Sequence, residues 1–213
     1  MITSYTAFTI GGIIAGAVVA RLMRDGRTRG KINYWFFIAA AFGIVIGAKL
    51  PLLITYGLRA EFLHTGKSFC GGLVGAFVAV NFYKFFARRR NAALGGRFVV
   101  PLAVAAGVGK IGCAVNGCCG GVGNFPAQIF ESAFQFLCAI GLYVYYRKTG
   151  RLELLFPLYM ALYLSMRFAV EFVRVEPRVA LGLTVYQFIA LGVLPFVFFI
   201  IHNRSKNCEY EYR

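Results

Sequence analysis

The fold is decided by stretches such as "YWFFIAAAFGIVIGAKLPLLIT", Tyr34–Thr55, in which 22 consecutive residues include one charged side chain, Lys49. About 20 apolar residues in a helix are needed to cross about 30 Å of hydrocarbon, so this stretch is long enough to span a membrane. Of the 213 residues, 59% are hydrophobic and 15% are charged, whereas soluble domains contain about 25% charged residues. The composition therefore predicts a protein of the lipid bilayer.

Six further apolar stretches follow the same pattern, and most of them approach the length of a membrane-spanning helix. We therefore predict an all-α, polytopic membrane protein of about seven transmembrane helices. No linker or soluble domain interrupts the pattern, so residues 1–213 are expected to form a single transmembrane domain. No basic residue precedes the first stretch, and a cleavable signal peptide is not expected. The six stretches are Tyr5–Ala20, Phe69–Ala87, Phe98–Val115, Ala127–Tyr146, Leu154–Phe172 and Leu183–His202.

The Lys and Arg residues are distributed unevenly between the two sides of the predicted membrane. Sixteen of the 23 lie in the first, third and fifth connections and in the tail, whereas the second, fourth and sixth connections hold four. Cytoplasmic loops carry an excess of Lys and Arg, so the N-terminus is predicted outside and the C-terminus in the cytoplasm. The net charge of +15 therefore indicates the topology and a contact of the basic residues with anionic lipid. It does not indicate a surface that binds nucleic acid.

The stretch "GKIGCAVNGCCGG", Gly109–Gly121, places polar groups and three of the six cysteines between apolar segments. It leads into the fourth connection, which the predicted topology places outside. Non-helical backbone at this depth is tolerated only where it is buried in protein or lines a cavity. The polar residues of the stretch are Lys110, Cys113, Asn116, Cys118 and Cys119.

Two of the predicted helices carry polar residues on one face. Gln128 and Glu131 are three residues apart in the fifth segment, and Arg167, Glu171 and Arg174 share one face of the sixth. A charge within hydrocarbon costs about 2.5–3.5 kcal/mol on insertion scales, so such groups face a cavity or one another.

The predicted topology brings these polar positions together near the outer ends of their helices. We expect a polar cavity that opens outward and suits an anionic head group such as phosphate, which Arg binds through two parallel hydrogen bonds. Its charges would be Lys49, Lys110 and Arg167 against Glu131 and Glu171, a slight positive excess.

Four stretches resemble, in order, motifs of the bacterial prolipoprotein diacylglyceryl transferase family, and they cover about a fifth of the chain. They are "KSFCGGLVG" (Lys67–Gly75), Gly109–Gly121, "FPAQIFES" (Phe125–Ser132) and "MRFAVEFVRVEP" (Met166–Pro177). The family moves a diacylglyceryl group from phosphatidylglycerol to the cysteine thiol of a prolipoprotein signal peptide, and glycerol phosphate leaves. The resemblance implies a multi-pass protein of the bacterial plasma (inner) membrane, with its active site toward the outer face and no cofactor.

The resemblance also implies roles for individual residues. Arg167 and Lys110 are expected to hold the phosphate and to stabilise charge on the leaving group, and Glu171 to hold Arg167 in place. Asn116 is expected to orient the glycerol backbone or the phosphate. The expected catalytic set is Arg167, Lys110, Cys70, His64, Glu131 and Glu171. The expected substrate-binding set is Asn116, Gly117, Gln128, Arg174, Gly71 and Gly72.

The chain departs from the family pattern at several of these positions. Cys70 stands where the family has a histidine, and Lys110 stands where it has an arginine. A thiol does not replace a histidine base near neutral pH without a large shift of its pKa. His64 or Glu131 would then be the alternative base for the incoming thiol.

Four cysteines near one predicted cavity leave a second interpretation open. Cys70, Cys113, Cys118 and Cys119 would form disulfides, bind a soft metal such as zinc or copper(I), supply a nucleophile for a covalent lipid intermediate, or be small apolar residues. The second interpretation is therefore a thiol-based metal-binding or redox protein on the same scaffold. A third is a transporter of small anions that uses the same basic cavity.

Overall fold

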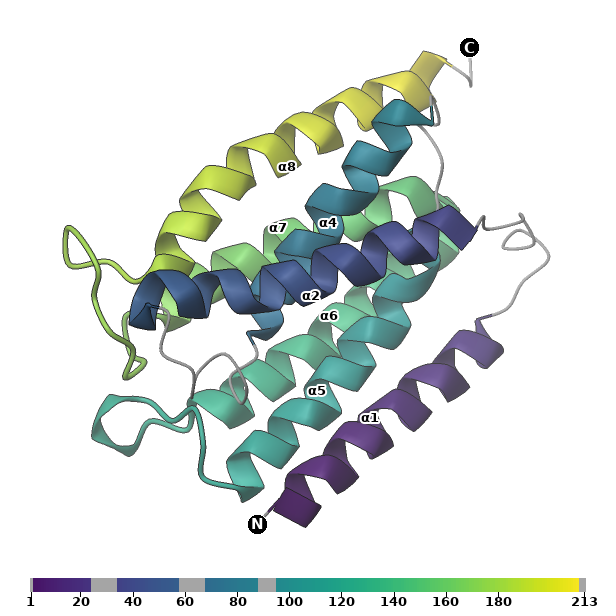
Figure 1. Cartoon of the computed structure of the whole chain (residues 1–213). Coiled ribbons are helices and arrows are strands. Elements are labelled where there is room, and N and C mark those ends of the chain that lie inside the picture. Colours follow the sequence, from purple (N-terminus) through teal and green to yellow (C-terminus); the bar gives the residue numbers. More distant parts are fainter. Residues whose placement is uncertain (1, 24–33, 58–67, 88–94, 211–213) are drawn as a thin grey trace.

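The computed structural model describes residues 2–23, 34–57, 68–87 and 95–210, and these form a bundle of helices (Figure 1). No β-strand occurs in these residues, which contain two isolated β-bridges, so the all-α prediction is confirmed. The helices are α1 (Ile2–Leu22), α2 (Tyr34–Tyr56), α4 (Phe69–Phe86), α5 (Val99–Val115), α6 (Ala127–Thr149), α7 (Leu152–Val170) and α8 (Val185–Tyr210), with 3₁₀ turns η2 (Gly96–Phe98) and η3 (Val122–Asn124).

Within the described ranges, six helices are long and apolar enough to cross a membrane, and a shorter apolar stretch, Thr6–Leu22, lies within α1. The prediction of a polytopic membrane protein with about seven such helices is therefore confirmed. The predicted bounds differ from the observed ones by a few residues. The helix α6, for example, continues to Thr149 because Gly150, with φ of 68°, ends it in a left-handed conformation.

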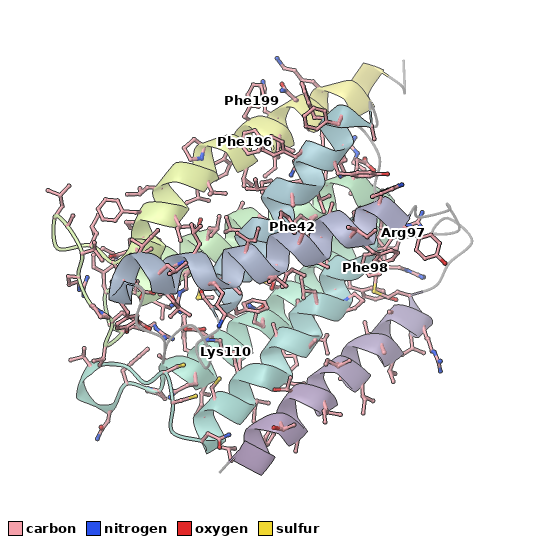
Figure 2. All side chains as sticks on the ribbon, viewed as in Figure 1. Phe42, Arg97, Phe98, Lys110, Phe196 and Phe199 are labelled. Carbon is pink, nitrogen blue, oxygen red and sulfur yellow. The ribbon has the colours of Figure 1, made fainter. Side chains whose placement is uncertain are left out.

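The two ends of the bundle differ in composition. The N- and C-termini lie at opposite ends, and the loops before α6 and after α7 share the end near the N-terminus (Figure 1). The C-terminal ends of α1, α4, α6 and α8 lie at the other end, which carries Arg21, Lys84, Arg147 and Arg204. Figure 2 places Lys110 toward the loop end and Arg97 toward the basic end. We refer to these as the loop end and the basic end, and the distribution of Lys and Arg predicts that the basic end is cytoplasmic.

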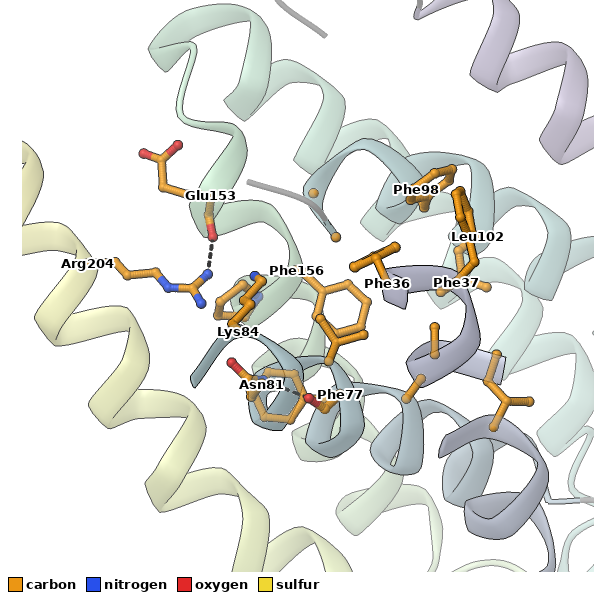
Figure 3. Close-up of a pocket in the computed structure, with 17 residues that line it drawn as sticks. Phe36, Phe37, Phe77, Asn81, Lys84, Phe98, Leu102, Glu153, Phe156 and Arg204 are labelled. Atoms are coloured by element: carbon orange, nitrogen blue, oxygen red, sulfur yellow. Dashed lines mark hydrogen bonds between the residues drawn. The ribbon is translucent and has the colours of Figure 1, made fainter. Parts of the chain in front are cut away.

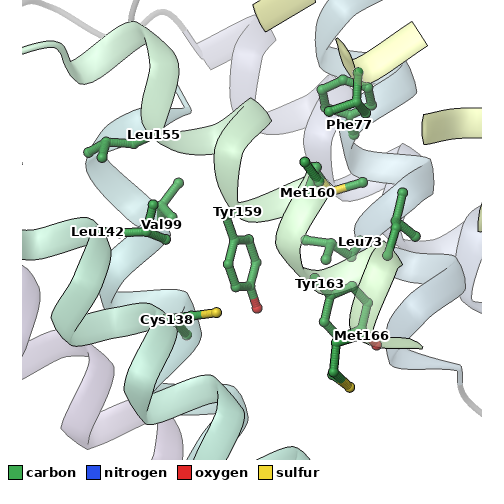
Figure 4. Packing of buried hydrophobic residues seen from close by; sticks show 14 of the residues in the cluster. Leu73, Phe77, Val99, Cys138, Leu142, Leu155, Tyr159, Met160, Tyr163 and Met166 are labelled. Atoms are coloured by element: carbon green, nitrogen blue, oxygen red, sulfur yellow. The ribbon is translucent and has the colours of Figure 1, made fainter. Parts of the chain in front are cut away.

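The core lies where α6 and α7 pack against α4, α5 and α8. Figure 4 shows Tyr159 and Tyr163 of α7 directed into this core, among side chains of α4 and α6. The hydroxyl of Tyr159 donates a hydrogen bond of 2.8 Å to Gln135 Oε1. Buried polar groups of this kind need a partner because hydrocarbon offers none, so this bond fixes the facing sides of α6 and α7, the helices that carry the site described below.

Helices α2 and α4 approach closely through glycines spaced four residues apart. Gly43 and Gly47 of α2 lie against Gly75 and Gly71 of α4, and a Cβ atom at any of the four would overlap the backbone of the opposite helix. Small residues at this spacing let membrane helices pack backbone to backbone, which replaces the hydrophobic driving force that lipid does not supply.

The variant Gly75→Leu is expected to lower the free energy of unfolding by about 1–3 kcal/mol, because added carbon atoms force packed helices apart. Its Cβ would meet the Gly43 carbonyl and lie 2.8 Å from Gly47 Cα. Gly141→Leu on α6 is the matched control, since a Cβ there meets nothing within 4 Å. Thermal unfolding of the purified variants in detergent checks this, and equal melting temperatures for the two would contradict the packing argument.

Candidate functional site

The site is built around Glu131, a carboxylate of α6 near the loop end whose side chain is 1% exposed. Its Oε2 forms an ion pair with Lys110 Nζ of α5. Its Oε1 accepts hydrogen bonds of 3.0 Å from Arg167 Nη1 of α7 and 2.8 Å from Arg174 Nη1 of the following loop. Three cations from three segments thus converge on one buried carboxylate.

Two further carboxylates complete the network. Arg167 Nη2 lies 3.0 Å from Glu171 Oε2, one turn further along the chain, and the Glu171 side chain is 0% exposed. Arg174 Nη2 donates a hydrogen bond of 3.0 Å to Glu176 Oε1. Burial raises the pKa of Glu171, against the opposing charges of Arg167 and Arg174. Three cations and three carboxylates therefore balance, which makes a buried charge cluster tolerable.

The charged side chains of the expected cavity form a buried network among the described residues. The Glu131 carboxylate takes the position between the cations, and the side chains of Arg167 and Arg174 are 6% and 5% exposed. Lys110 is more accessible, with 15% of its side chain exposed. A phosphate would therefore approach from the Lys110 side and compete with Glu131 for the same N–H donors.

A second group of side chains supports Arg167 from the side of α4 and α8. The Arg167 guanidinium stacks 4.6 Å above the ring of Tyr186, an attraction between a cation and an aromatic face. Cys70 is buried, lies beside Tyr163 and is within electrostatic range of Arg167. The family histidine position is therefore next to Arg167, although the thiol itself is shielded from water.

The loop after α5 is anchored to the rest of the site. Asn116 Nδ2 donates 2.8 Å to the Gly112 carbonyl, and Gly117 then takes a left-handed conformation with φ of 66° that ends the helix. Gln128 Nε2 donates 2.6 Å to the Cys118 carbonyl. An isolated antiparallel bridge joins Gly121 to Arg174, so the loop also fixes the backbone that carries one of the three cations.

Three of the four cysteines singled out in the sequence lie together in this loop. The sulfur atoms of Cys113, Cys118 and Cys119 lie within 4.8 Å of one another, whereas Cys70 is buried on α4. A hydrogen bond with the Cys113 thiol, aided by the charges of Lys110 and Arg174, lowers the pKa of Cys119 to about 5. Desolvation opposes this effect and does not overcome it. The surroundings of this group therefore favour a thiolate at Cys119.

Three further residues singled out in the sequence lie on α2 and α4. Gly71 lies against Gly47 and Pro51 of α2, and Gly72 lies beside Ile44, so both shape the contact between α2 and α4. Lys49 is partly buried in the second half of α2. His64 lies outside the described residues.

Two residues of the site were absent from the sequence-based sets. Glu176 follows Arg174 by two positions, inside the stretch "MRFAVEFVRVEP" already matched to the family, and that proximity was a usable signal. Tyr186 lies on α8 and contacts Arg167 from another helix. No local pattern indicates such a contact, because it depends on how two helices pack.

The comparisons with known proteins agree on one family. A family model described as prolipoprotein diacylglyceryl transferase matches residues 1–202. A phosphatidylglycerol–prolipoprotein diacylglyceryl transferase 2 of Clostridium perfringens (strain 13 / Type A) is 29% identical over 220 residues, which span 88% of this chain and 85% of the relative. A phosphatidylglycerol–prolipoprotein diacylglyceryl transferase of Clostridium tetani (strain Massachusetts / E88) is 29% identical over 236 residues, spanning 94% of this chain and 92% of the relative.

Proposed function

The chain belongs to the prolipoprotein diacylglyceryl transferase family, and we propose that it transfers a diacylglyceryl group from phosphatidylglycerol to the thiol of a prolipoprotein signal-peptide cysteine. The observation that carries this proposal is the convergence of Lys110, Arg167 and Arg174 on Glu131. Such a set of donors, at the end of the bundle opposite the basic end, suits the phosphate of a phospholipid in the outer leaflet.

The reaction forms one bond and breaks one. The acceptor sulfur bonds to the terminal glyceryl carbon, the bond from that carbon to the phosphate oxygen breaks, and glycerol phosphate leaves with the electron pair. Negative charge therefore grows on the leaving phosphate. Prepositioned cationic donors stabilise such charge more in the transition state than in the ground state. No electron is gained or lost overall, so the chemistry needs no redox cofactor, and we propose that none is used.

We assign the phosphate to Arg167, Arg174 and Lys110, in exchange for their contacts with Glu131. Glu131 and Glu171 then act as positioning residues, which hold the guanidinium groups in place when no phosphate is bound. Gln128 and Asn116 hold the loop that brings Arg174 to the site. Gly117 allows the left-handed turn of that loop.

The acceptor thiol must lose its proton, and the network itself favours this loss. Cys119 has a pKa of about 5 through its hydrogen bond with Cys113 and its proximity to Lys110 and Arg174. The positive charges of Lys110 and Arg174 would favour the thiolate of a signal-peptide cysteine that comes close to them, and its proton would pass to water or to the departing phosphate. The chemistry then does not require a histidine at the position of Cys70.

The test is a transfer assay with the purified chain in nanodiscs of phosphatidylglycerol and a synthetic peptide that contains a lipobox cysteine. The peptide is expected to gain the mass of one diacylglyceryl group, and a Cys→Ser peptide is expected to gain none. Nanodiscs of phosphatidylcholine are the control for the donor. A peptide that stays unmodified with every phospholipid tried would overturn the proposal.

The cysteine loop supports a second, more limited proposal, that the thiols hold a soft cation such as zinc or copper(I). Nothing in the comparisons favours a metal-binding function for the chain as a whole. The sulfurs of Cys113, Cys118 and Cys119 nevertheless lie within 4.8 Å of one another. Ligands of a tetrahedral zinc with Zn–S bonds of about 2.3 Å are about 3.8 Å apart, so shifts of about 1 Å would close the site.

The chain is expected to retain stoichiometric zinc after gel filtration, and Cys118→Ser/Cys119→Ser is expected to lose it. Cys138→Ser is the control, because Cys138 is buried on α6 and takes no part in the group. Alkylation at pH 6.5 gives a second measurement. Above about pH 5 Cys119 is a thiolate, so it should react with iodoacetamide, and zinc should slow that reaction. Equal zinc retention by the double variant would contradict this assignment.

A further inference from the structure

A second concentration of polar groups lies at the basic end, far from the transfer site. A cavity of about 220 Å³ opens between α2, α4, α7, the start of α5 and the end of α8. Figure 3 shows its lining, with aromatic rings on one side and the side chains of Lys84 and Arg204 on the other. Both cations belong to helix ends that the distribution of Lys and Arg places at the cytoplasmic surface.

The walls of this cavity are almost entirely apolar. The Phe77 and Phe156 rings stack with centroids 5.8 Å apart, and Phe36 stacks on Phe98 at 6.4 Å. All four rings line the cavity. Apolar cavities of about 150 Å³ stay dry and accept hydrocarbon. The cavity is therefore suited to hold part of an alkyl chain rather than a cluster of water molecules.

Lys84 is the unusual member of the lining. The residue is 6% exposed, and among the described residues it forms neither an ion pair nor a hydrogen bond. A buried ammonium group without a counter-ion is strongly unfavourable. The residue lines the cavity together with Phe77 and Phe156 (Figure 3).

A second cation lies beside it, which increases the imbalance. The Arg204 guanidinium is close enough for its charge to act on Lys84. Arg204 Nη1 donates 2.6 Å to the backbone carbonyl of Glu153, at the start of α7. Asn81 of α4 also lines the cavity. Its Nδ2 donates a hydrogen bond of 2.7 Å to the backbone carbonyl of Phe77. Glu153 also lines the cavity, and its charge acts on Arg204, so the described lining holds two cations and one carboxylate.

We propose that the basic end binds an anionic phospholipid of the inner leaflet, with the phosphate between Lys84 and Arg204 and one acyl chain entering the cavity. The phosphate supplies the negative charge that Glu153, the one carboxylate of the described lining, leaves unmatched, and the acyl chain fills the apolar space. Basic pockets between transmembrane helices on the cytoplasmic side suit this chemistry. The bound lipid would link the end of α8 to α4, because each of these helices carries one of the two cations.

The test compares the full chain in nanodiscs of phosphatidylglycerol and of phosphatidylcholine. The thermal midpoint is expected to be higher in phosphatidylglycerol for the wild type. Lys84→Met/Arg204→Met is expected to reduce that difference to the part that comes from phosphatidylglycerol at the transfer site, because each cation near anionic lipid contributes about five-fold in apparent affinity. Arg147→Met is the matched control, since Arg147 is an exposed cation at the same end of the bundle, and it is expected to keep the difference.

Further arms separate the possible outcomes. Inorganic phosphate in phosphatidylcholine discs is expected to have no effect, because it lacks the acyl chain. If the double variant fails to fold, Arg204→Gln, which leaves Lys84 and the cavity in place, is expected to lose part of the lipid-dependent gain. Equal gains in the double variant and the wild type, or equal midpoints in the two lipids, would overturn the proposal.

The same samples distinguish this lipid from the substrate lipid of the transfer site. The double variant is expected to keep its transfer activity, since both substitutions lie at the opposite end of the bundle. Conversely, Arg167→Gln, which is expected to lose most of its transfer activity, is expected to keep a higher thermal midpoint in phosphatidylglycerol than in phosphatidylcholine. If replacing Arg167 abolished the difference in thermal midpoint between the two lipids, the stabilisation would belong to the transfer site, and a second lipid site would be refuted.

Discussion

Replacing Arg167 by glutamine is expected to reduce transfer by about 100- to 1000-fold, the cost of removing one well-placed donor from a charge-stabilising site. Arg167 is the one residue that joins Glu131, Glu171 and the ring of Tyr186. Glutamine keeps part of the length but removes the charge and the planar fork. The measurement is the rate of peptide modification in phosphatidylglycerol nanodiscs, at saturating peptide.

The same change also affects stability, and the two effects can be separated. Without Arg167, the fully buried Glu171 loses its ion pair, and breaking a buried pair typically costs about 3–5 kcal/mol. The double variant Arg167→Gln/Glu171→Gln restores the charge balance and is expected to recover the melting temperature but not the activity. Arg167→Lys keeps the charge but lacks the planar fork of the guanidinium, so its transfer rate is expected to lie between those of the wild type and Arg167→Gln. Activity above a tenth of the wild type in Arg167→Gln would refute the assigned role.

Replacing Glu131 by leucine is expected to be the most destabilising single change at the site. Three cations converge on this carboxylate, and without it they repel one another in a region with little solvent. The loss is expected to reach or exceed about 3–5 kcal/mol, the cost of one broken buried pair. Thermal unfolding in detergent, together with the transfer rate, measures the effect.

A charge-balanced partner variant tests the reason for this loss. Glu131→Gln/Lys110→Met removes one charge of each sign, and it is expected to be more stable than Glu131→Gln alone. If Lys110→Met brings no recovery, repulsion among the cations is not the cause of the instability. Addition of phosphatidylglycerol should also stabilise Glu131→Gln more than the wild type, because the phosphate no longer competes with a carboxylate.

Much of the fold could be predicted because it depends on local composition. Long apolar stretches such as Tyr34–Thr55 form helices wherever lipid leaves backbone groups no other partner. The helix bounds were off by a few residues where a local turn decides the end, as at Gly150. The spacing of Arg167 and Glu171 also predicted a pair on one face, and the structure contains it.

The partners of each charge could not be predicted in the same way. Arg174 and Glu131 are 43 residues apart, and the ring that supports Arg167 belongs to α8. The sequence predicted a cavity with a positive excess, and only the structure shows that Glu131 lies between the three cations. The two-cation cavity at the basic end was also not foreseen, because Lys84 and Arg204 were counted only as topology signals.

The sequence by itself determined the all-α membrane architecture, the uneven charge of its two ends and the family, because these depend on hydropathy, counts and motif order. The tertiary structure alone decided which carboxylate binds the three cations, which thiols lie together and which lysine is buried without an ion pair to any described residue. The physical reason is that each helix can take any rotation about its own axis. Helices that face lipid are apolar over most of their surface, so their pattern says little about which apolar face turns inward, and only packing between helices brings particular side chains into contact.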